Sequence, residues 1–320
     1  MKIAVLTSGG DAPGMNAAIR AVVRYADYYD IEVYGVERGY AGLIAGNLSI
    51  MSRRSVSDII QRGGTKLRTA RSAEFETYEG QKQAAKVLSF YGIDGLVVIG
   101  GDGSFRGLQA ISKNFGVKGV GIPGTIDNDI ASSDYTIGYD TCMNTVVQNV
   151  DRLRDTSQSH DRCSVVEVMG RNAGHIAVNA GLACGAIAIL IPEIPYDVDK
   201  DIVERIKASQ KTGKQHFIVM VAEGIGHSEE LAKEIEAKTG VESRATVLGH
   251  IQRGGSPTLR DRVMASHMGS YAVDLLEKGI GNRVVASKGG EIVDYDILEA
   301  LNMKKTVDMD LLRIAQDIAL

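Results

Sequence analysis

Two aspartates, Asp127 and Asp129, stand one residue apart in the stretch GIPGTIDNDIA (121–131), directly after a short apolar run. If this stretch is extended, residues two apart point to the same side, and the two carboxylates lie close together. A carboxylate in such a place can take a proton from a reacting hydroxyl group, or it can ligate a metal ion. The pair therefore indicates either a catalytic base with a supporting neighbour or a metal site, and this stretch by itself leaves both interpretations open.

Two glycine-rich turns, TSGGDAPGMN (7–16) and GGDGS (100–104), each follow an apolar run and open a helical pattern. Small residues let backbone N–H groups approach a phosphate, and a helix N-terminus attracts negative charge. Asp102 adds a carboxylate that could hold Mg2+, although it could equally be the N-cap of the following helix. The first turn has Met15 in place of the Walker A lysine, and the second lacks the third glycine of the dinucleotide fingerprint at position 106. A P-loop NTPase is excluded, and a Rossmann oxidoreductase is disfavoured.

Arginines near turns supply the positive charge that a phosphate site needs. Four of them stand beside Gly, Cys, Ser or other turn residues rather than on helical faces: Arg162, Arg171, Arg244 and Arg253. Arg71 in RTARSAEF (68–75) precedes a small residue, and His250 lies close to Arg253 in GHIQRGGSP (249–257). Guanidinium groups recognise phosphates through several hydrogen bonds. With the glycine turns and the aspartate pair, these residues predict phosphoryl transfer, which needs donor positioning, charge neutralisation and a carboxylate for the acceptor's proton.

The elements that would position these residues alternate between strand and helix patterns. Five apolar runs end in glycine or a polar residue, as buried parallel strands do: 3–11, 96–103, 119–127, 164–171 and 217–224. Helical periodicity covers 13–29, 201–213 and 261–279, and a glycine closes the last two. This alternation predicts an α/β fold with a parallel sheet and right-handed crossovers. In such sheets, ligands gather beyond the carboxyl ends of the strands, where the glycine-rich and charged positions stand.

The composition limits the functional class. The 320 residues are 44% hydrophobic with 37 glycines and no tryptophan, which predicts a globular protein of two domains. A net charge of −4 argues against a binder of nucleic acids or acidic membranes. Cys142, Cys163 and Cys184 match no zinc or C-x-x-C spacing, so we expect reduced, mostly buried thiols. The N-terminus lacks the features of a signal peptide, and the longest apolar stretch (185–192) is too short to span a bilayer, so we expect a cytoplasmic protein.

With these motifs the sequence resembles the bacterial ATP-dependent 6-phosphofructokinases over nearly its whole length. Five motifs in the same order carry the resemblance: LTSGGDAPGMNAAIR (6–20), VVIGGDGS (97–104), PGTIDND (123–129), VEVMGRNAG (166–174) and RATVLGHIQRGGSP (244–257). The resemblance implies an α/β fold of two doubly wound domains with largely parallel sheets and the active site in the cleft between them. The larger, ATP-binding domain would comprise 1–138 plus 251–302, and the smaller, sugar-phosphate-binding domain 139–250 plus 303–320. The chain would form a homotetramer with active sites shared between subunits.

The family's functional residues can be transferred to the matching positions. The resemblance implies that Asp127 takes the proton from the C1 hydroxyl of fructose 6-phosphate, with Asp129 and Thr125 in support, in the committing step of glycolysis. Arg171 would neutralise the transferred phosphoryl group, and Asp102 would hold Mg2+. ATP would bind to Gly10, Arg71, Ser72, Gly101, Asp102, Gly103 and Ser104. Fructose 6-phosphate would bind to Thr125, Ile126, Asp127, Arg162, Met169, Gly170, Arg171, Glu223, Arg244, His250, Ile251, Gln252 and Arg253, with Arg162 and Arg244 reaching it from a neighbouring subunit.

Two glycines bear on the phosphate donor. In relatives that use pyrophosphate, position 103 tends to be aspartate and position 124 lysine, whereas this chain has Gly103 and Gly124, so the resemblance favours ATP. A pyrophosphate-dependent enzyme of the same fold is the nearest alternative. A catalytically silent sugar-phosphate sensor is another, but the carboxylates at positions 102, 127 and 129 argue against it, because nearby negative charge weakens anion binding.

The regulatory site departs from the family pattern. The residues that would bind an ADP or phosphoenolpyruvate effector are present at six positions: Arg20, Arg24, Arg53, Arg154, Gly185 and Lys214. However, Ile187 replaces the usual glutamate and Thr212 a usual arginine, and a hydrocarbon cannot ligate the effector's Mg2+. We therefore expect a weakened or altered response to both effectors. Lys66, Arg68 and His175 also depart from the pattern, and the first two add positive charge just before the expected ATP residues.

Overall fold

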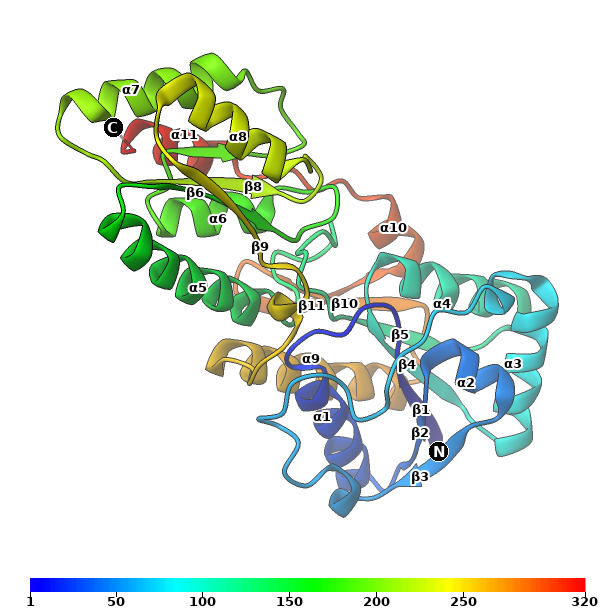
Figure 1. Cartoon of the computed structure of the whole chain (residues 1–320). Helices are drawn as coiled ribbons and strands as arrows, with labels where there is room; N and C mark the ends of the chain where they lie inside the picture. Colours follow the sequence, from blue (N-terminus) through cyan, green and yellow to red (C-terminus); the bar gives the residue numbers. More distant parts are fainter. Residues whose placement is uncertain (320) are drawn as a thin grey trace. The chain divides into compact units, whose positions relative to one another are not determined.

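The computed structural model describes residues 1–319, and within them the chain divides into two compact units (Figure 1). Unit 1 comprises Met1–Ile126, Ile130–Thr141 and Arg253–Lys305. Unit 2 comprises Asp127–Asp129, Cys142–Gln252 and the described residues from Thr306 onward. Each unit contains a largely parallel sheet with helices, which confirms the predicted α/β class. In this described part, no helix has both the length and the apolar character needed to cross a bilayer.

Unit 1 is built on a seven-stranded sheet in the order β11-β10-β5-β4-β1-β2-β3. Its strands are β1 (Lys2–Thr7), β2 (Glu32–Val36), β3 (Leu48–Met51), β4 (Gly95–Gly100), β5 (Gly119–Pro123), β10 (Arg283–Lys288) and β11 (Glu291–Asp296). The inner strands are parallel, whereas β3 and β11 pair antiparallel at the edges. The strand order reverses at the neighbours β1 and β4, since β1 leads to β2 on one side and β4 to β5 on the other. Ligands bind beyond the carboxyl ends of strands at such a reversal, so the segments after β1 and β4 are placed for binding.

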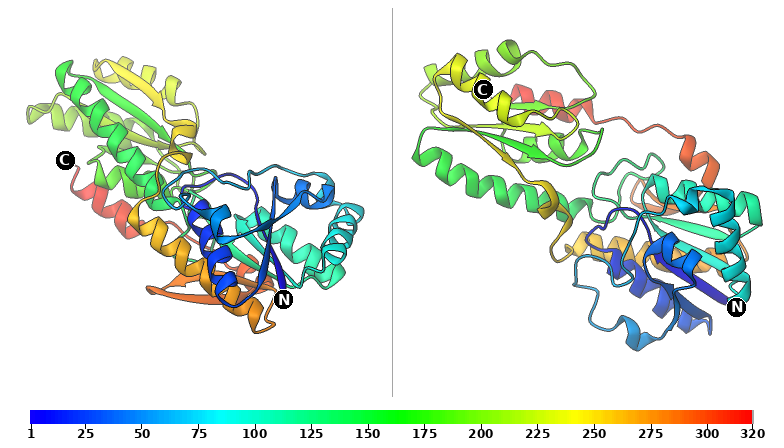
Figure 2. Two further views of the ribbon diagram at one scale, coloured as in Figure 1. Left: turned by 90° about the horizontal axis from the view of Figure 1, so that it is seen from below. Right: turned by 45° about the vertical axis from the view of Figure 1, so that its right-hand side comes forward.

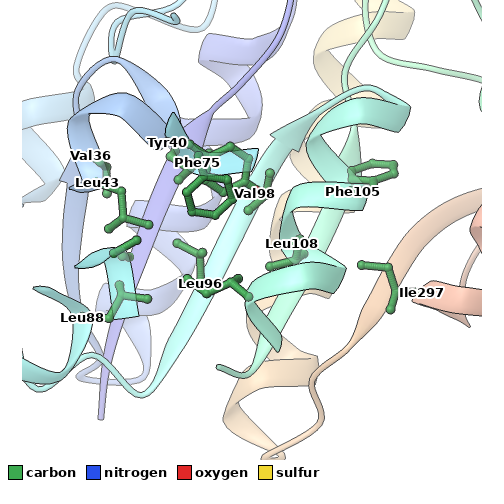
Figure 3. Close-up of a cluster of buried hydrophobic side chains, with 14 of the residues drawn as sticks. Val36, Tyr40, Leu43, Phe75, Leu88, Leu96, Val98, Phe105, Leu108 and Ile297 are labelled. Carbon is green, nitrogen blue, oxygen red and sulfur yellow. The ribbon is translucent and has the colours of Figure 1, made fainter. Parts of the chain in front are cut away.

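Helices cover both faces of this sheet. They are α1 (Met15–Tyr28), α2 (Gly39–Ala45), α3 (Tyr78–Tyr91), α4 (Asp102–Phe115), α9 (Leu259–Glu277) and α10 (Ile297–Asn302). The helices α1 and α9, dark blue and ochre in Figures 1 and 2, pack against each other. They belong to one face, because Gly95 of β4 faces Leu276 of α9. On the opposite face, Leu96 and Val98 join side chains of α2, α3 and α4 in the apolar cluster of Figure 3.

Unit 2 has a four-stranded parallel sheet in the order β7-β8-β6-β9. Its strands are β6 (Cys163–Val168), β7 (Ala188–Leu190), β8 (Phe217–Ala222) and β9 (Ser243–Val247). Its helices are α5 (Tyr139–Ser159, which belongs to unit 2 from Cys142 onward), α6 (His175–Ala183), α7 (Glu204–Lys211, after a π-helical turn Asp199–Val203), α8 (Ser228–Thr239) and α11 (Met309–Asp317). The helix α11, red in Figure 2, packs on α6 and β7. The three cysteines are free and buried, as predicted, and burial raises the pKa of the Cys163 thiol to about 12.

Candidate functional site

The turn after β1 joins two distant parts of the chain within unit 1. Gly9 (φ 83°) and Gly14 (φ 107°) are left-handed, a conformation that favours glycine, and α1 begins directly after Gly14. A Cβ added to Gly10 would lie 2.2 Å from Nη1 of Arg253, so the missing side chain lets this guanidinium lie against the backbone. Arg253 also donates to the carbonyl oxygen of Asp11 at 3.2 Å. The structure therefore brings together a residue predicted for ATP, Gly10, and one predicted for the sugar phosphate, Arg253.

The turn after β4 lies beside the first one, because the amide of Ser8 donates to the carbonyl oxygen of Ile99 at 2.9 Å. Gly101 is the N-cap of α4 and provides no side-chain cap, so the alternative interpretation of Asp102 as the N-cap is wrong. The carboxylate of Asp102 is partly exposed and pairs instead with Arg106 one turn later, with 2.7 Å between Nε and Oδ2. The carboxylate thus projects from the first turn of α4, where backbone N–H groups also attract a phosphate.

Asp102 is the predicted Mg2+ ligand. Among residues 1–319, no three His, Cys, Asp or Glu side chains gather into a group that could hold a metal ion by themselves. Mg2+ usually binds through one or two carboxylates together with water and the phosphates of a substrate. A single accessible carboxylate at a helix N-terminus that could attract a phosphate fits that mode of binding. The ion pair with Arg106 is exposed on both sides and therefore weak, so a cation can replace the guanidinium.

The two glycines that bear on the donor differ in their surroundings. Within the described chain, a Cβ at Gly103 would meet nothing within 4 Å. At Gly124 it would lie 3.0 Å from Cγ2 of Ile99 and 3.2 Å from Cε of Met15, so these side chains would have to move. Position 103 therefore accepts a side chain without strain on the fold, whereas position 124 is packed.

The segment with Arg71 and Ser72 is tied to the first glycine turn. The hydroxyl of Thr69 donates to the carbonyl oxygen of Gly9 at 2.8 Å. The Oγ of Ser72 accepts from the amide of Phe75, within the 3₁₀ turn Glu74–Glu76, at 3.2 Å, while the side chain of Arg71 is exposed. The predicted ATP residues of unit 1 thus stand on three segments that are hydrogen-bonded to one another through Ser8 and Gly9.

The aspartate pair belongs to unit 2, where it faces Arg171. The Nε of Arg171 is 3.8 Å from Oδ2 of Asp127, and its Nη1 is 3.9 Å from Oδ2 of Asp129. One guanidinium thus approaches both carboxylates at ion-pair rather than hydrogen-bond distance. The side chain of Asp127 is 4% exposed and that of Asp129 25%, so the two differ in their access to water. The expected extended backbone is wrong at Asn128, whose φ of 51° is left-handed.

The turn after β6 is shaped by a carboxylate from the end of the neighbouring strand β8. Oε1 of Glu223 accepts from the amide of Gly170 at 3.1 Å and from that of Arg171 at 2.5 Å. Gly170 (φ 137°) adopts its conformation freely as a glycine, whereas Arg171 (φ 54°) lies in the left-handed region that favours glycine and needs such support. Glu223, predicted to hold the sugar phosphate, therefore also fixes the backbone that presents the Arg171 guanidinium.

Gln252 was predicted to bind the substrate, but its side chain is buried inside unit 2. It is fully buried, its Oε1 accepts from the amide of Met169 at 3.2 Å, and its Nε2 donates to the carbonyl oxygen of Gly249 at 3.1 Å. The side chains of His250 and Ile251 are exposed. Gln252 thus connects the segment 249–252 to the turn after β6 from inside unit 2, and its side chain does not point to solvent.

The structure does not bring Arg162 and Arg244 to Arg171. They stand at the amino ends of the paired strands β6 and β9, whereas Arg171 follows the carboxyl end of β6. Both bind Glu242, with Nε of Arg162 2.8 Å from Oε2 and Nη2 of Arg244 2.7 Å from Oε1. The hydrogen bonds from Arg162 and then Arg244 lower the pKa of Glu242. Within one chain, these two arginines therefore form a separate cationic site.

The six predicted effector residues fall into two groups. In unit 1, Arg20 and Arg24 of α1 line a cavity of about 420 Å3 together with Ser266 and Ser270 of α9. Burial, followed by repulsion from Arg24, lowers the pKa of Arg20. Arg53, from the same unit, pairs with Asp27.

In unit 2, Arg154 donates to the carbonyl oxygen of Cys184, which precedes Gly185. Burial and then repulsion from Arg154 lower the pKa of Lys214, so these two cations lie close together. The side chain of Ile187 is 1% exposed and belongs to the apolar core of unit 2. Position 187, where the family usually has glutamate, therefore offers no side-chain oxygen to a metal ion, and its side chain is not accessible to solvent.

Two buried polar side chains of unit 1, close to the predicted ATP residues, were not singled out from the sequence. Asn16 in the first turn of α1 and Thr7 at the end of β1 both bind backbone atoms of the segment 62–69. A polar residue inside a strongly apolar stretch was the available signal, since Thr7 ends an apolar run and Asn16 precedes two alanines. That signal predicts burial of a polar group but not its partner.

Comparisons with known proteins agree on one family. The family model described as Phosphofructokinase matches residues 2–276. ATP-dependent 6-phosphofructokinase 1 of Clostridium perfringens is 58% identical over 317 residues, and ATP-dependent 6-phosphofructokinase of Clostridium tetani is 58% identical over 318; each alignment covers 99% of both chains. The structure of phosphofructokinase from Saccharomyces cerevisiae superposes with a TM-score of 0.90 at 34% identity. That match covers 99% of this chain and 48% of the yeast chain, so this chain spans about half of that relative's length.

Proposed function

The chain belongs to the phosphofructokinase family, and we propose that it transfers the γ-phosphoryl group of ATP to the C1 hydroxyl of fructose 6-phosphate with Asp127 as the general base. The products are fructose 1,6-bisphosphate and ADP. The observation that carries the assignment of residues is the guanidinium of Arg171, which faces both carboxylates of the pair. A base beside a cation is the arrangement that phosphoryl transfer to a hydroxyl requires.

Asp127 and Asp129 receive different roles because they differ in exposure. The carboxylate of Asp127 is nearly buried, so few water molecules compete with a sugar hydroxyl for its oxygens. Asp129 is more exposed and balances the charge of Arg171 from the second side. When the γ-phosphoryl group moves, Arg171 turns from these carboxylates to the phosphoryl oxygens and neutralises their charge. Thr125, two residues before Asp127 in the chain, supports this base.

The donor side is assigned to the three joined segments of unit 1. The backbone of Gly10 and of Gly101–Ser104 approaches the phosphates, and Arg71 and Ser72 contact ATP from the third segment. Asp102 would hold Mg2+, which would supply positive charge beside the phosphates of ATP. We assign this donor site to the larger domain (1–138 plus 251–302) and the sugar phosphate to the smaller one (139–250 plus 303–320).

The sugar-phosphate side uses two sets of residues. Met169, Gly170, Glu223, His250 and Arg253 bind the sugar phosphate in the same chain. Arg162 and Arg244 act on the substrate of a neighbouring subunit, which accounts for their distance along β6 from Arg171. The active assembly is accordingly a homotetramer in the cytoplasm.

The regulatory response is weakened. ADP or phosphoenolpyruvate would meet the cationic side chains of the two groups of predicted effector residues. The side chain of Ile187, however, lies in the apolar core and offers no ligand to a metal ion bound with the effector. Rate curves against fructose 6-phosphate should therefore shift little when ADP is added. A strong shift of the curve to lower substrate concentrations would contradict this part of the proposal.

The base is tested by Asp127→Ser. Loss of a general base lowers kcat by about a hundred- to ten-thousand-fold, while the affinity for fructose 6-phosphate should change only about threefold or less. Asp134→Ser is the matched control, because Asp134 is an exposed aspartate seven residues away that pairs with Lys288 at 2.7 Å. The control should keep its turnover.

The assay couples production of fructose 1,6-bisphosphate to NADH oxidation, with ATP and pyrophosphate compared as donors. Activity with ATP alone is the expected result. Near-normal turnover of Asp127→Ser would refute the assignment of the base, and activity with pyrophosphate but not ATP would refute the donor.

A further inference from the structure

The segment 62–69 precedes the predicted ATP residues Arg71 and Ser72 and is held by a buried amide. The side chain of Asn16 is 3% exposed. Its Nδ2 donates to the carbonyl oxygens of Arg62 and Gly63, each at 3.1 Å, and its Oδ1 accepts from the amide of Lys66 at 2.6 Å. One side chain thus fixes both ends of the tight loop from Arg62 to Lys66.

A second buried group holds the other end of the segment. The hydroxyl of Thr7, which is fully buried, donates to the carbonyl oxygen of Arg68 at 2.8 Å. Because a hydroxyl has one hydrogen, the 2.9 Å contact between the hydroxyls of Thr7 and Thr65 must be donated by Thr65. The carbonyl oxygen of Leu67 accepts from the amide of Arg38 at 2.8 Å, and the Leu67 side chain is buried. Every contact here lies within unit 1.

The held backbone is strained and strongly cationic. Arg68 has a φ of 57°, a left-handed conformation that costs a non-glycine residue roughly 1 kcal/mol or more and persists only when its surroundings enforce it. The side chains of Arg62, Lys66, Arg68 and Arg71 are all exposed within ten residues, so mutual repulsion also favours opening of the segment. The hydrogen bonds of Asn16 and Thr7 act against both tendencies.

We propose that Asn16 is a positioning residue of the donor site: its amide fixes the segment 62–69 against the start of α1 and thereby sets where Arg71 and Ser72 meet ATP. The same helix start ends the glycine turn that contains Gly10. Asn16 therefore keeps two donor-binding segments in register although they are about fifty residues apart in the chain. The identity of the donor as ATP rests on the proposed function. The three hydrogen bonds between Asn16 and the segment 62–69, which we call the clamp, do not depend on it.

Asn16→Ala removes all three hydrogen bonds of the clamp. The KM for ATP should rise about tenfold, as expected when roughly one net hydrogen bond to the donor is lost, whereas kcat and the KM for fructose 6-phosphate should stay within about twofold. Thr7→Val is the second variant, since it removes the other anchor with little change in shape and keeps the test informative if Asn16→Ala does not fold. Ser112→Ala is the matched control, because Ser112 is also buried and donates to the carbonyl oxygen of Val117 at the far end of α4.

Limited trypsin digestion supplies a readout that is independent of activity. The four exposed cations provide cleavage sites, and cleavage requires the backbone to open. Cleavage within 62–71, identified by the masses of the fragments, should be at least about tenfold faster in Asn16→Ala than in Ser112→Ala or the wild type, in line with the loss of the same hydrogen bonds.

The proposal is overturned if Asn16→Ala and Thr7→Val keep both the KM for ATP and the cleavage rate of the wild type. It is also overturned if the KM values of both substrates rise together, since this indicates a general loss of structure. Absence of ATP-dependent activity in the wild type would refute the proposed function, while the cleavage rates would still decide whether Asn16 holds the segment.

Discussion

Gly103→Asp should separate the stability of the fold from the use of ATP. Gly103 is the second residue of α4, and an added Cβ would meet nothing within 4 Å in the described chain. Replacing a helical glycine gains about 0.5–1 kcal/mol, and an acidic side chain in the first turn of a helix gains about 0.3–1 kcal/mol. Together these gains amount to about 0.8–2 kcal/mol. Solvent screening and the lower helix propensity of aspartate relative to alanine reduce them, so the free energy of unfolding should rise by about 0–1 kcal/mol.

The same carboxylate should strongly weaken binding of ATP. It would stand beside the backbone N–H groups of α4 that are proposed to approach the phosphates. Two negative charges about 5 Å apart at an effective dielectric constant of about 20 repel by about 3 kcal/mol. This energy corresponds to a change in affinity of about a hundredfold. The KM for ATP should rise by about that factor, with the KM for fructose 6-phosphate nearly unchanged.

Steady-state rates over a range of ATP concentrations give the KM, and urea unfolding gives the stability. Gly103→Ala is the control, because it adds the same Cβ without the charge and should change the KM for ATP by no more than about threefold, as expected for a contact that does not crowd. If Gly103→Asp is folded and keeps the KM of the wild type, Gly103 does not lie against the donor phosphates, and the assignment of the GGDGS turn to ATP is wrong.

Two further predictions concern buried charge. Asp261 is fully buried and accepts four hydrogen bonds from the segment 135–141. The variant Asp261→Asn turns an NH2 group toward two of these donors, so it should lower the free energy of unfolding in urea by about 3 kcal/mol. The control Asp296→Asn, at the N-cap of α10, should change this free energy by less than about 0.5 kcal/mol. Burial, then Arg154 and Lys214, lower the pKa of His216 below 6.5. The charged imidazole is therefore disfavoured in the folded state, and stability falls as the pH decreases from 6.5 through the lowered pKa. Bound ADP should raise this pKa in an NMR titration, and no shift at saturating ADP would contradict an effector site at these cations.

The type of the five strands and three helices named from the sequence was right, but their ends were not, and strands such as β2, β9 and β10 were not predicted. Continuous apolar runs gave the buried strands, because strands covered on both faces need no polar alternation. The run 3–11 nevertheless ends as a strand at Thr7, where the amide of Ser8 turns to Ile99. Helix α1 begins only at Met15, since Gly14 is left-handed. Hydrophobicity reports burial, whereas the ends depend on which backbone groups find partners across the sheet.

The residue types of the candidate site indicate a chemistry that stays a prediction, and they do not indicate which buried side chains support the site. The aspartate pair, the glycine turns and the arginines all stand at positions that the motifs marked. A motif does not state which polar side chains face inward, however. Gln252 was expected at the substrate and instead bonds to Met169 inside unit 2, while Asn16 stood unnoticed in the same motif as Gly10. Such roles depend on contacts between residues that are far apart in the chain.

Two arginines form loose ion pairs with the carboxylates to which the proposed function assigns the base and the metal ligand. Arg171 faces the aspartate pair at 3.8 and 3.9 Å, and Arg106 covers the carboxylate of Asp102. Each of these guanidinium groups is more than half exposed. The Arg106–Asp102 pair is exposed on both sides and contributes only about 0–1 kcal/mol, whereas Arg171 stays beyond hydrogen-bond distance of the nearly buried Asp127. Under the proposed function, a phosphate would draw Arg171 away from the aspartate pair, and Mg2+ would replace Arg106 at Asp102 at little cost in stability. Within unit 2, the guanidinium of Arg171 limits the repulsion between Asp127 and Asp129, and under the proposed function its departure toward a phosphate releases the base.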